Sequence, residues 1–230
     1  MRWIMPLLFL PLPALAQEVD LELVLLADAS GSIDQEEVEF QRQGYATAIT
    51  HPDVLYAISS TLTGTIAVTY VEWAANQVVV VDWAVIDGPE AAQAFAARLL
   101  IPPRLATGRN AIGAALLEGK RLIEDNQITS LRQVIDFSGD SIGNFSGPRI
   151  SDARAEVLAA GITINGLPIL RDARAQDLAQ AYADQIIGGP GAFVVAATSR
   201  DTFASAVRRK LVLEIAGMPE GQVIAQAISP

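Results

Sequence analysis

Short apolar runs that alternate with helical patterns extend along this sequence and limit the folds that it can adopt. Residues 21–27 form a continuous apolar run interrupted only by Glu22, which is typical of a strand covered on both faces. Residues 133–137 form a second such strand, and helical patterns of about 10 to 15 residues alternate with the strands. This alternation predicts an α/β fold in which a Rossmann-like, doubly wound and mostly parallel central sheet carries helices on both faces.

An early hairpin adds one antiparallel edge strand to the predicted sheet. Residues 65–73 and 78–85 are strand-like runs separated by a short connection. Asp34 and Glu37 have the spacing of a capping box at the start of the first helix. Within the last helix we expect the basic run Arg208-Arg209-Lys210 to face solvent. The other predicted strands span 162–169 and 193–197, and the predicted helices span 34–49, 89–101, 111–124, 149–160, 173–187 and 201–216.

The N-terminal residues 1–16 have the features of a secretory signal peptide. Arg2 precedes a short apolar run, and Ala14-Leu15-Ala16 offers a cleavage site that leaves Gln17 as the mature start. We therefore expect an exported protein, periplasmic or secreted, with no membrane insertion after signal cleavage. The mature chain is predicted to form one domain over residues 17–218, followed by a C-terminal tail over 219–230.

The composition excludes several kinds of metal site and partner. The sequence has no cysteine and a single histidine, His51, so thiolate and clustered imidazole ligands are excluded. Any metal would be held by oxygen atoms, which select hard cations such as Mg²⁺, Ca²⁺ or Mn²⁺. The net charge of −10 disfavours nucleic acid and anionic membranes as partners.

Three oxygen-bearing side chains follow the first strand. Asp28, Ser30 and Ser32 alternate along an extended loop, so they point to one side, and Gly31 allows a tight turn. One carboxylate and two hydroxyl groups suit a sparsely liganded Mg²⁺ that keeps several water molecules. Serine and aspartate are also common helix caps between a strand and a helix, and the loop alone does not separate these interpretations.

A second polar loop follows the strand over 133–137 and contains Asp140. Ligands of parallel sheets bind beyond the carboxyl ends of the strands, so Asp140 is expected to face Asp28 across that crevice. The alternative is a plain turn, because Ser, Gly, Asp and Asn all favour turns.

Together with the segment over 106–116, these loops resemble the metal-ion-dependent adhesion site (MIDAS) of von Willebrand factor A (VWA) domains. Asp28, Ser30 and Ser32 match the D-x-S-x-S element of the family, and Asp140 matches its later aspartate. The resemblance extends over the order of elements in the mature chain. The family's central threonine is replaced: the helix register places Asn110 at that position, and Thr107 lies three residues earlier. Either residue would complete the site.

The resemblance implies a metal-dependent protein-binding module without enzymatic activity. In the family the serines bind the cation directly, the aspartates bind it directly or through water, and an Asp or Glu carboxylate of a partner protein takes the open position. Mg²⁺, or Ca²⁺ or Mn²⁺, is the implied cation. A VWA scaffold with a degenerate, empty site that binds through another surface is one alternative.

A serine hydrolase is the other alternative. Residues 139–143 match G-x-S-x-G after a strand, with Ser141 as nucleophile. His51, the only candidate base, precedes the serine and is followed by Pro52 in what we expect to be an exposed turn at a helix end.

Overall fold

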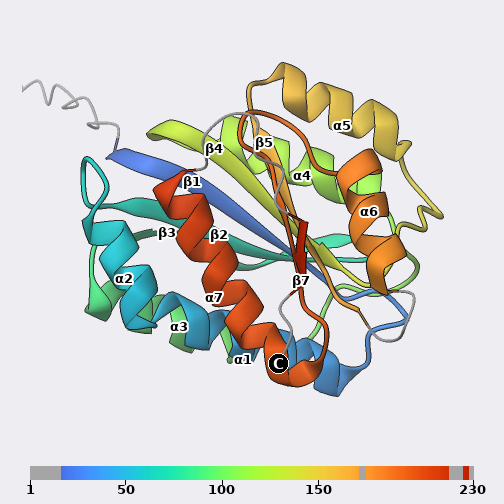
Figure 1. The fold of residues 1–230 in the computed structure, drawn as a ribbon, viewed down its shortest axis with the longest axis horizontal. Helices are drawn as coiled ribbons and strands as arrows, with labels where there is room; N and C mark the ends of the chain where they lie inside the picture. The colour runs from blue at the N-terminus through green and yellow to red at the C-terminus, as the bar shows by residue number, and fades with distance from the viewer. Residues whose placement is uncertain (1–16, 171–174, 218–224, 228–230) are drawn as a thin grey trace, which may run out of the picture.

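The computed structural model describes residues 17–170, 175–217 and 225–227. The predicted signal peptide over 1–16 lies outside these residues, as do 219–224 and 228–230 of the predicted tail. Figure 1 shows a central sheet that runs between two groups of helices. No helix in the described ranges has the length and apolar character needed to span a membrane.

The sheet is mostly parallel, as predicted. Within the described residues it has seven strands, in the order β3-β2-β1-β4-β5-β6-β7. Every neighbouring pair is parallel except β2 and β3, which form the predicted antiparallel hairpin at one edge. The strands are β1 (Gln17–Asp28), β2 (Ile66–Trp73), β3 (Gln77–Ile86), β4 (Ile128–Gly139), β5 (Thr163–Pro168), β6 (Val194–Ala196) and β7 (Ala225–Ala227).

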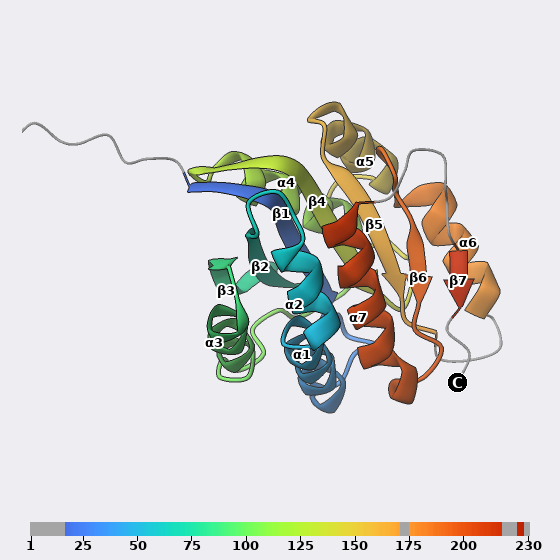
Figure 2. The ribbon, with the colours of Figure 1, turned by 60° about the vertical axis from the view of Figure 1, so that its left-hand side comes forward.

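Helices cover both faces of this sheet. The helices are α1 (Gln35–Ile49), α2 (Pro52–Ser59), α3 (Pro89–Leu99), α4 (Ile112–Glu124), α5 (Ile150–Ala159), α6 (Ala175–Gln185) and α7 (Arg200–Ala216). Figure 2 shows α1, α2, α3 and α7 on one face and α4, α5 and α6 on the other. The Rossmann-like α/β fold expected from the sequence is therefore confirmed.

The first strand shows why its sequence is apolar throughout. Leu23 and Leu25 pack into the core cluster beneath α1, α2 and α7, whereas Val24 and Leu26 pack into the cluster beneath α4, α5 and α6. Successive side chains of a strand point to opposite faces, so a strand between two helical layers needs apolar residues at both its odd and its even positions. The strand ends where Asp28 begins the polar loop.

The predicted capping box at the start of α1 is present. The Asp34 carboxylate accepts a hydrogen bond from the backbone N–H of Glu37, and the Glu37 carboxylate accepts one from the backbone N–H of Asp34. This cap fixes the point at which the loop after β1 becomes helical.

Two expectations about individual segments change. His51 is a turn residue, as expected, but it also caps the helix α2, which was not predicted from the sequence. Its side chain accepts a hydrogen bond from Asp53 N at the start of α2. The expectation that Lys210 faces solvent is wrong. Its side chain is fully buried and forms ion pairs with Asp136 of β4 and Glu214 of α7.

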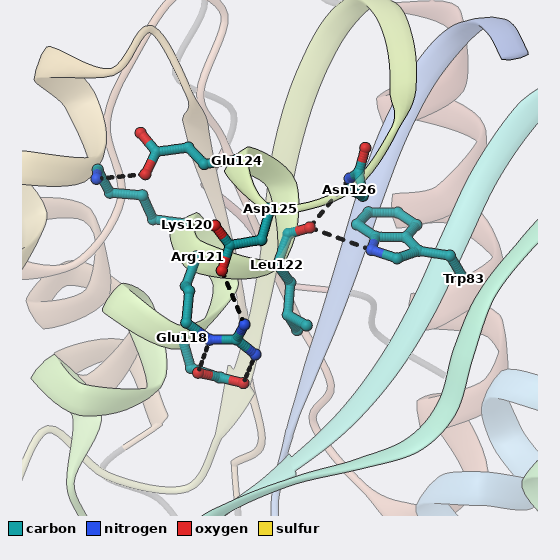
Figure 3. Close-up of polar contacts among 8 residues, drawn as sticks. All are labelled: Trp83, Glu118, Lys120, Arg121, Leu122, Glu124, Asp125 and Asn126. Carbon is teal, nitrogen blue, oxygen red and sulfur yellow. Dashed lines mark hydrogen bonds and ion pairs between the residues drawn. The ribbon is translucent and has the colours of Figure 1, made fainter. Parts of the chain in front are cut away.

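The C-terminal end of α4 is fixed to the edge of the sheet. Trp83 of β3 donates from Nε1 to the carbonyl of Leu122 at 3.2 Å, and Figure 3 shows this contact as a dashed line. Arg121 forms ion pairs with Glu118 and Asp125 beside this contact. Exposed ion pairs of this kind contribute little stability, so the buried face of α4 and the Trp83 bond hold the helix in place. Its opposite end carries the loop that contains Asn110.

Candidate metal centre

The two predicted loops lie side by side at one edge of the sheet. β1 ends at Asp28, and β4 ends at Gly139. The two strands are parallel neighbours, with Leu26 opposite Phe137. Their carboxyl ends therefore meet, and the side chains that follow them face a common space.

Hydrogen bonds connect four of the predicted ligands. Asp28 Oδ1 accepts from the backbone N–H of Ser30 at 2.8 Å, and Ser30 Oγ lies 3.3 Å from Ser32 Oγ. Ser32 Oγ donates to Asp140 Oδ1 at 3.2 Å. The backbone N–H of Asp140 reaches Asp28 Oδ2 at 3.4 Å. Two carboxylates and two hydroxyl groups are thus joined in one chain of hydrogen bonds between the loops.

Burial makes the charge on Asp28 unfavourable. The side chain is almost fully buried, and this raises the pKa of its carboxyl group from 3.8 to about 6. The negative charge of Asp140 raises the pKa further, while hydrogen bonds from Ser30 lower it. A nearby cation would relieve both unfavourable effects.

Asn110 and Thr107, the two candidates for the position of the family's threonine, lie in different surroundings in the third loop. Asn110 is buried, and its Nδ2 donates to Ser141 Oγ at 2.8 Å, next to Asp140. Thr107 is exposed and its backbone contacts the β2–β3 hairpin: its N–H donates to Asn76 Oδ1, and its carbonyl accepts from Ala75 N. Gly31 N also donates to Gly108 O at 2.8 Å, so the first and third loops are in direct contact.

Arg104 supports the first loop from outside and was not identified from the sequence. Its guanidinium group donates to the carbonyl of Ile33 at 2.7 Å, to that of Ser30 at 3.0 Å and to that of Ala29 at 2.5 Å. On the helix side, Gln41 of α1 donates from Nε2 to the carbonyl of Asp28 at 2.9 Å. Both residues bind backbone carbonyls of the loop, so they fix its path.

The second loop is fixed against α4. Asn144 Oδ1 accepts from Gly113 N at 3.3 Å, and Asn144 Nδ2 donates to Pro148 O at 2.8 Å. The N-cap residue of α4, Ala111, supplies no side-chain acceptor, so Asn144 serves a free N–H group of the first turn. A Cβ at Gly113 would lie 2.2 Å from Pro148 O, so the two segments approach too closely for any other residue.

The structure does not bring a histidine to Ser141. His51 lies between α1 and α2, where its ring contacts Asp53 N and Arg208 Nη1. His51 is the only histidine of the chain. Ser141 itself contacts Asn110 and the backbone N–H of Gly143. The arrangement of a serine nucleophile with an imidazole base is therefore absent from the described residues.

The chemistry of the donor set fits a hard cation with few protein ligands. No group of three or more acidic or histidine side chains that could hold a metal occurs in the described part of the chain. The site instead combines two aspartates with serine hydroxyls, a set that suits Mg²⁺ with retained water. The absence of a side chain at Gly139 keeps the space open, because a Cβ there would lie 3.0 Å from Asp28 Oδ2 and 2.9 Å from Trp73 Cζ2.

Comparison with known proteins gives one family match. The model of a family described as "Protein of unknown function (DUF1194)" matches residues 18–219. No curated protein matches the chain significantly.

Several solved structures share the fold. A von Willebrand factor type A structure from Catenulispora acidiphila aligns with a TM-score of 0.57 at 16% identity, over 86% of this chain and 43% of that one. Proximal thread matrix protein 1 (PTMP1) from the mussel byssus, in a structure with a zinc-occupied MIDAS motif, aligns with a TM-score of 0.61 at 14% identity, over 87% and 49%. The vWF domain of the type V pili tip protein Mfa5 from Porphyromonas gingivalis aligns with a TM-score of 0.57 at 9% identity, over 90% and 98%. This chain spans less than half of the length of the first two.

Proposed function

The chain belongs to the DUF1194 family and has the fold of a VWA domain, and we propose that it is a metal-dependent protein-binding module. Its cation site lies at the carboxyl ends of β1 and β4. A carboxylate of a partner protein completes the coordination of the cation.

One observation carries this proposal: Asp28, Ser30, Ser32 and Asp140 converge from two loops and are connected to one another by hydrogen bonds. If these side chains were helix caps, each would accept a hydrogen bond from the backbone at the start of the helix that follows it. The helix α1 is already capped by Asp34. The Asp28 carboxylate is almost fully buried, and burial makes its negative charge unfavourable unless a positive charge lies close to it. A divalent cation beside Asp28 would supply that charge.

We assign Asn110 in preference to Thr107 as the ligand from the third loop. Asn110 is buried beside the loop that holds Asp140, whereas the backbone of Thr107 is bound to the β2–β3 hairpin. The side-chain carbonyl of Asn110 is an acceptable oxygen ligand for Mg²⁺ or Ca²⁺. Rotation of its amide group would exchange the present donor to Ser141 for this acceptor.

The proposed ligand set also accounts for the kind of partner. If the serines bind the cation directly and the aspartates bind it through water, the ligands in direct contact are mainly neutral, and the cation still attracts a further negative ligand. A carboxylate from an Asp or Glu of another protein is the ligand that such a cation attracts. The mussel protein, which holds zinc at its MIDAS motif, gives a precedent for metal binding in this fold.

We further propose that the protein acts outside the cytoplasm. The features of residues 1–16 are those of a cleavable export signal. The similarity to a pilus tip protein is consistent with a role at or beyond the cell envelope.

Isothermal titration calorimetry of the mature chain, from Gln17, tests the proposal. Mg²⁺, Mn²⁺ and Ca²⁺ are titrated into chelator-treated protein, and one binding site is expected for at least one of them. Asp28→Ala should abolish the binding, whereas Asp152→Asn, on the exposed surface of α5, should leave it unchanged.

The competing scaffold hypothesis predicts a different result. A degenerate site would show no saturable heat with any of the three cations. Binding that persists unchanged in Asp28→Ala would place the cation elsewhere and contradict our assignment.

A further inference from the structure

A tyrosine on the helix α6 reaches the candidate metal centre from the sheet face opposite α1. Tyr182 is fully buried and packs between α6 and the sheet, with its ring 5.8 Å from that of Phe137. Phe137 in turn stacks on Trp73, at 4.9 Å between ring centroids. The ring also lies against Gly166, where a Cβ would be 3.0 Å from Tyr182 Cδ1. These contacts hold the side chain in one direction.

That direction points the hydroxyl group toward Asp28. A Cβ at Gly139 would lie 3.0 Å from the Tyr182 hydroxyl oxygen and 3.0 Å from Asp28 Oδ2. Since both oxygens are equally close to the same point, they are at most about 6 Å apart. The hydroxyl group nevertheless has no hydrogen-bond partner among the described residues.

A buried hydroxyl group without a partner is unfavourable by about 1 to 3 kcal/mol, and such groups in native proteins are usually bound to ordered water. A single water molecule that accepts or donates two hydrogen bonds of normal length spans up to about 5.5 Å between its partners. The separation of at most about 6 Å between the Tyr182 hydroxyl oxygen and Asp28 Oδ2 is therefore comparable with the span of one bridging water molecule.

We propose that Tyr182 is a positioning residue of the cation site, whose hydroxyl group binds a water molecule in the coordination shell of the cation. The inference rests on the proposed function. It adds that the cation is held from both sides of the sheet: by the loops after β1 and β4, and by α6 through a water molecule. Groups that orient ligands in this way commonly change metal affinity by about 10- to 100-fold when they are removed.

Tyr182→Phe tests the proposal, because it keeps the ring and removes only the hydroxyl group. By calorimetry with Mg²⁺ and Mn²⁺, the variant should bind about tenfold more weakly than the wild type. The melting temperature of the cation-free variant should be unchanged or higher, because the substitution removes an unpaired buried polar group. In the Mn²⁺ complex, water proton relaxation should also change, because it reports the water molecules bound to the ion.

Tyr45→Phe is the matched control. Tyr45 is a buried tyrosine in the core cluster on the other face of the sheet, so its substitution should leave cation affinity and relaxation unchanged. Wild-type affinity in Tyr182→Phe would overturn the inference while leaving the proposed function intact. A loss of affinity that parallels a lower melting temperature of the cation-free protein would also overturn it, because the tyrosine would then be structural. Wild-type protein that binds no cation would instead refute the proposed function, and the inference with it.

Discussion

Ser32 donates a hydrogen bond from its Oγ to Oδ1 of Asp140 over 3.2 Å, and so joins two loops that are 108 residues apart in the sequence. The contact exists because β1 and β4 are parallel neighbours whose carboxyl ends meet. It links the two halves of the candidate metal centre directly.

Asp28→Asn is expected to stabilise the cation-free protein at pH 7.5. The pKa of Asp28 is raised from 3.8 to about 6, so its ionised form lowers the free energy of unfolding by up to about 3 kcal/mol. Asparagine keeps the acceptor for Ser30 N and removes the charge. Urea unfolding of chelator-treated wild type and variant measures the difference. A variant less stable than the wild type would contradict the argument.

The stability of the cation-free wild type should fall as pH rises from about 4 to about 6.5. In this window the folded protein binds more protons than the unfolded chain, because the folded pKa of Asp28, about 6, lies above the unfolded value of 3.8. Above the folded pKa the loss is complete. Cation binding requires the ionised form, so the rise in melting temperature caused by Mg²⁺ should be larger at pH 7.5 than at pH 5. Equal rises at both pH values would argue against Asp28 as the charged holder.

Arg104→Ala should weaken both the fold and the site. The guanidinium group binds three carbonyls of the loop that carries Ser30 and Ser32, and hydrogen bonds from a charged donor contribute about 1.5 to 3 kcal/mol. We expect a lower melting temperature and weaker cation binding. Arg98→Ala, an exposed change on α3, is the control. If Arg104→Ala binds the cation with wild-type affinity, the loop does not depend on this residue.

Lys210→Met should destabilise the protein by about 3 to 5 kcal/mol, because it leaves the carboxylates of Asp136 and Glu214 buried without a cationic partner. Burial raises the pKa of Glu214 to about 7 even with Lys210 present. Protonation of the two carboxyl groups should therefore restore part of the stability as pH falls from 7.5 to 5.5. Thermal unfolding over this pH range measures the effect.

Arg209→Met, next to Lys210 and exposed, is the control for that substitution. It should leave the melting temperature nearly unchanged at every pH. A Lys210→Met variant that is as stable as this control would contradict the assignment of a buried ion pair.

The sequence was sufficient to predict six strands of the sheet and the convergence of the four side chains that we propose as ligands, whereas β7 lies in the segment predicted as a tail. Both follow from local patterns: apolar runs define the strands, and the polar residues that come directly after β1 and β4 must lie at the same edge once the strands are parallel. The proximity of Asp28 and Asp140 can therefore be predicted without knowing how the side chains pack.

The residues that support the site were missed for the opposite reason. Arg104 and Tyr182 act on the site from segments distant in sequence from Asp28, and no local pattern distinguishes them from an ordinary surface arginine or core tyrosine. Lys210 was misjudged because its burial depends on Asp136, which lies on β4, beneath α7. An aspartate inside the apolar run 133–137 was the available sign that a buried cationic side chain would be needed.

A crystal of the mature chain grown with Mn²⁺ tests the central claim most directly. Anomalous scattering locates the ion without assumptions about its ligands. Our account predicts a single strong anomalous peak within coordinating distance of Ser30 Oγ and Ser32 Oγ, between the carboxylates of Asp28 and Asp140. No peak at that position in a crystal soaked at saturating Mn²⁺, or a peak only at another surface, would contradict it.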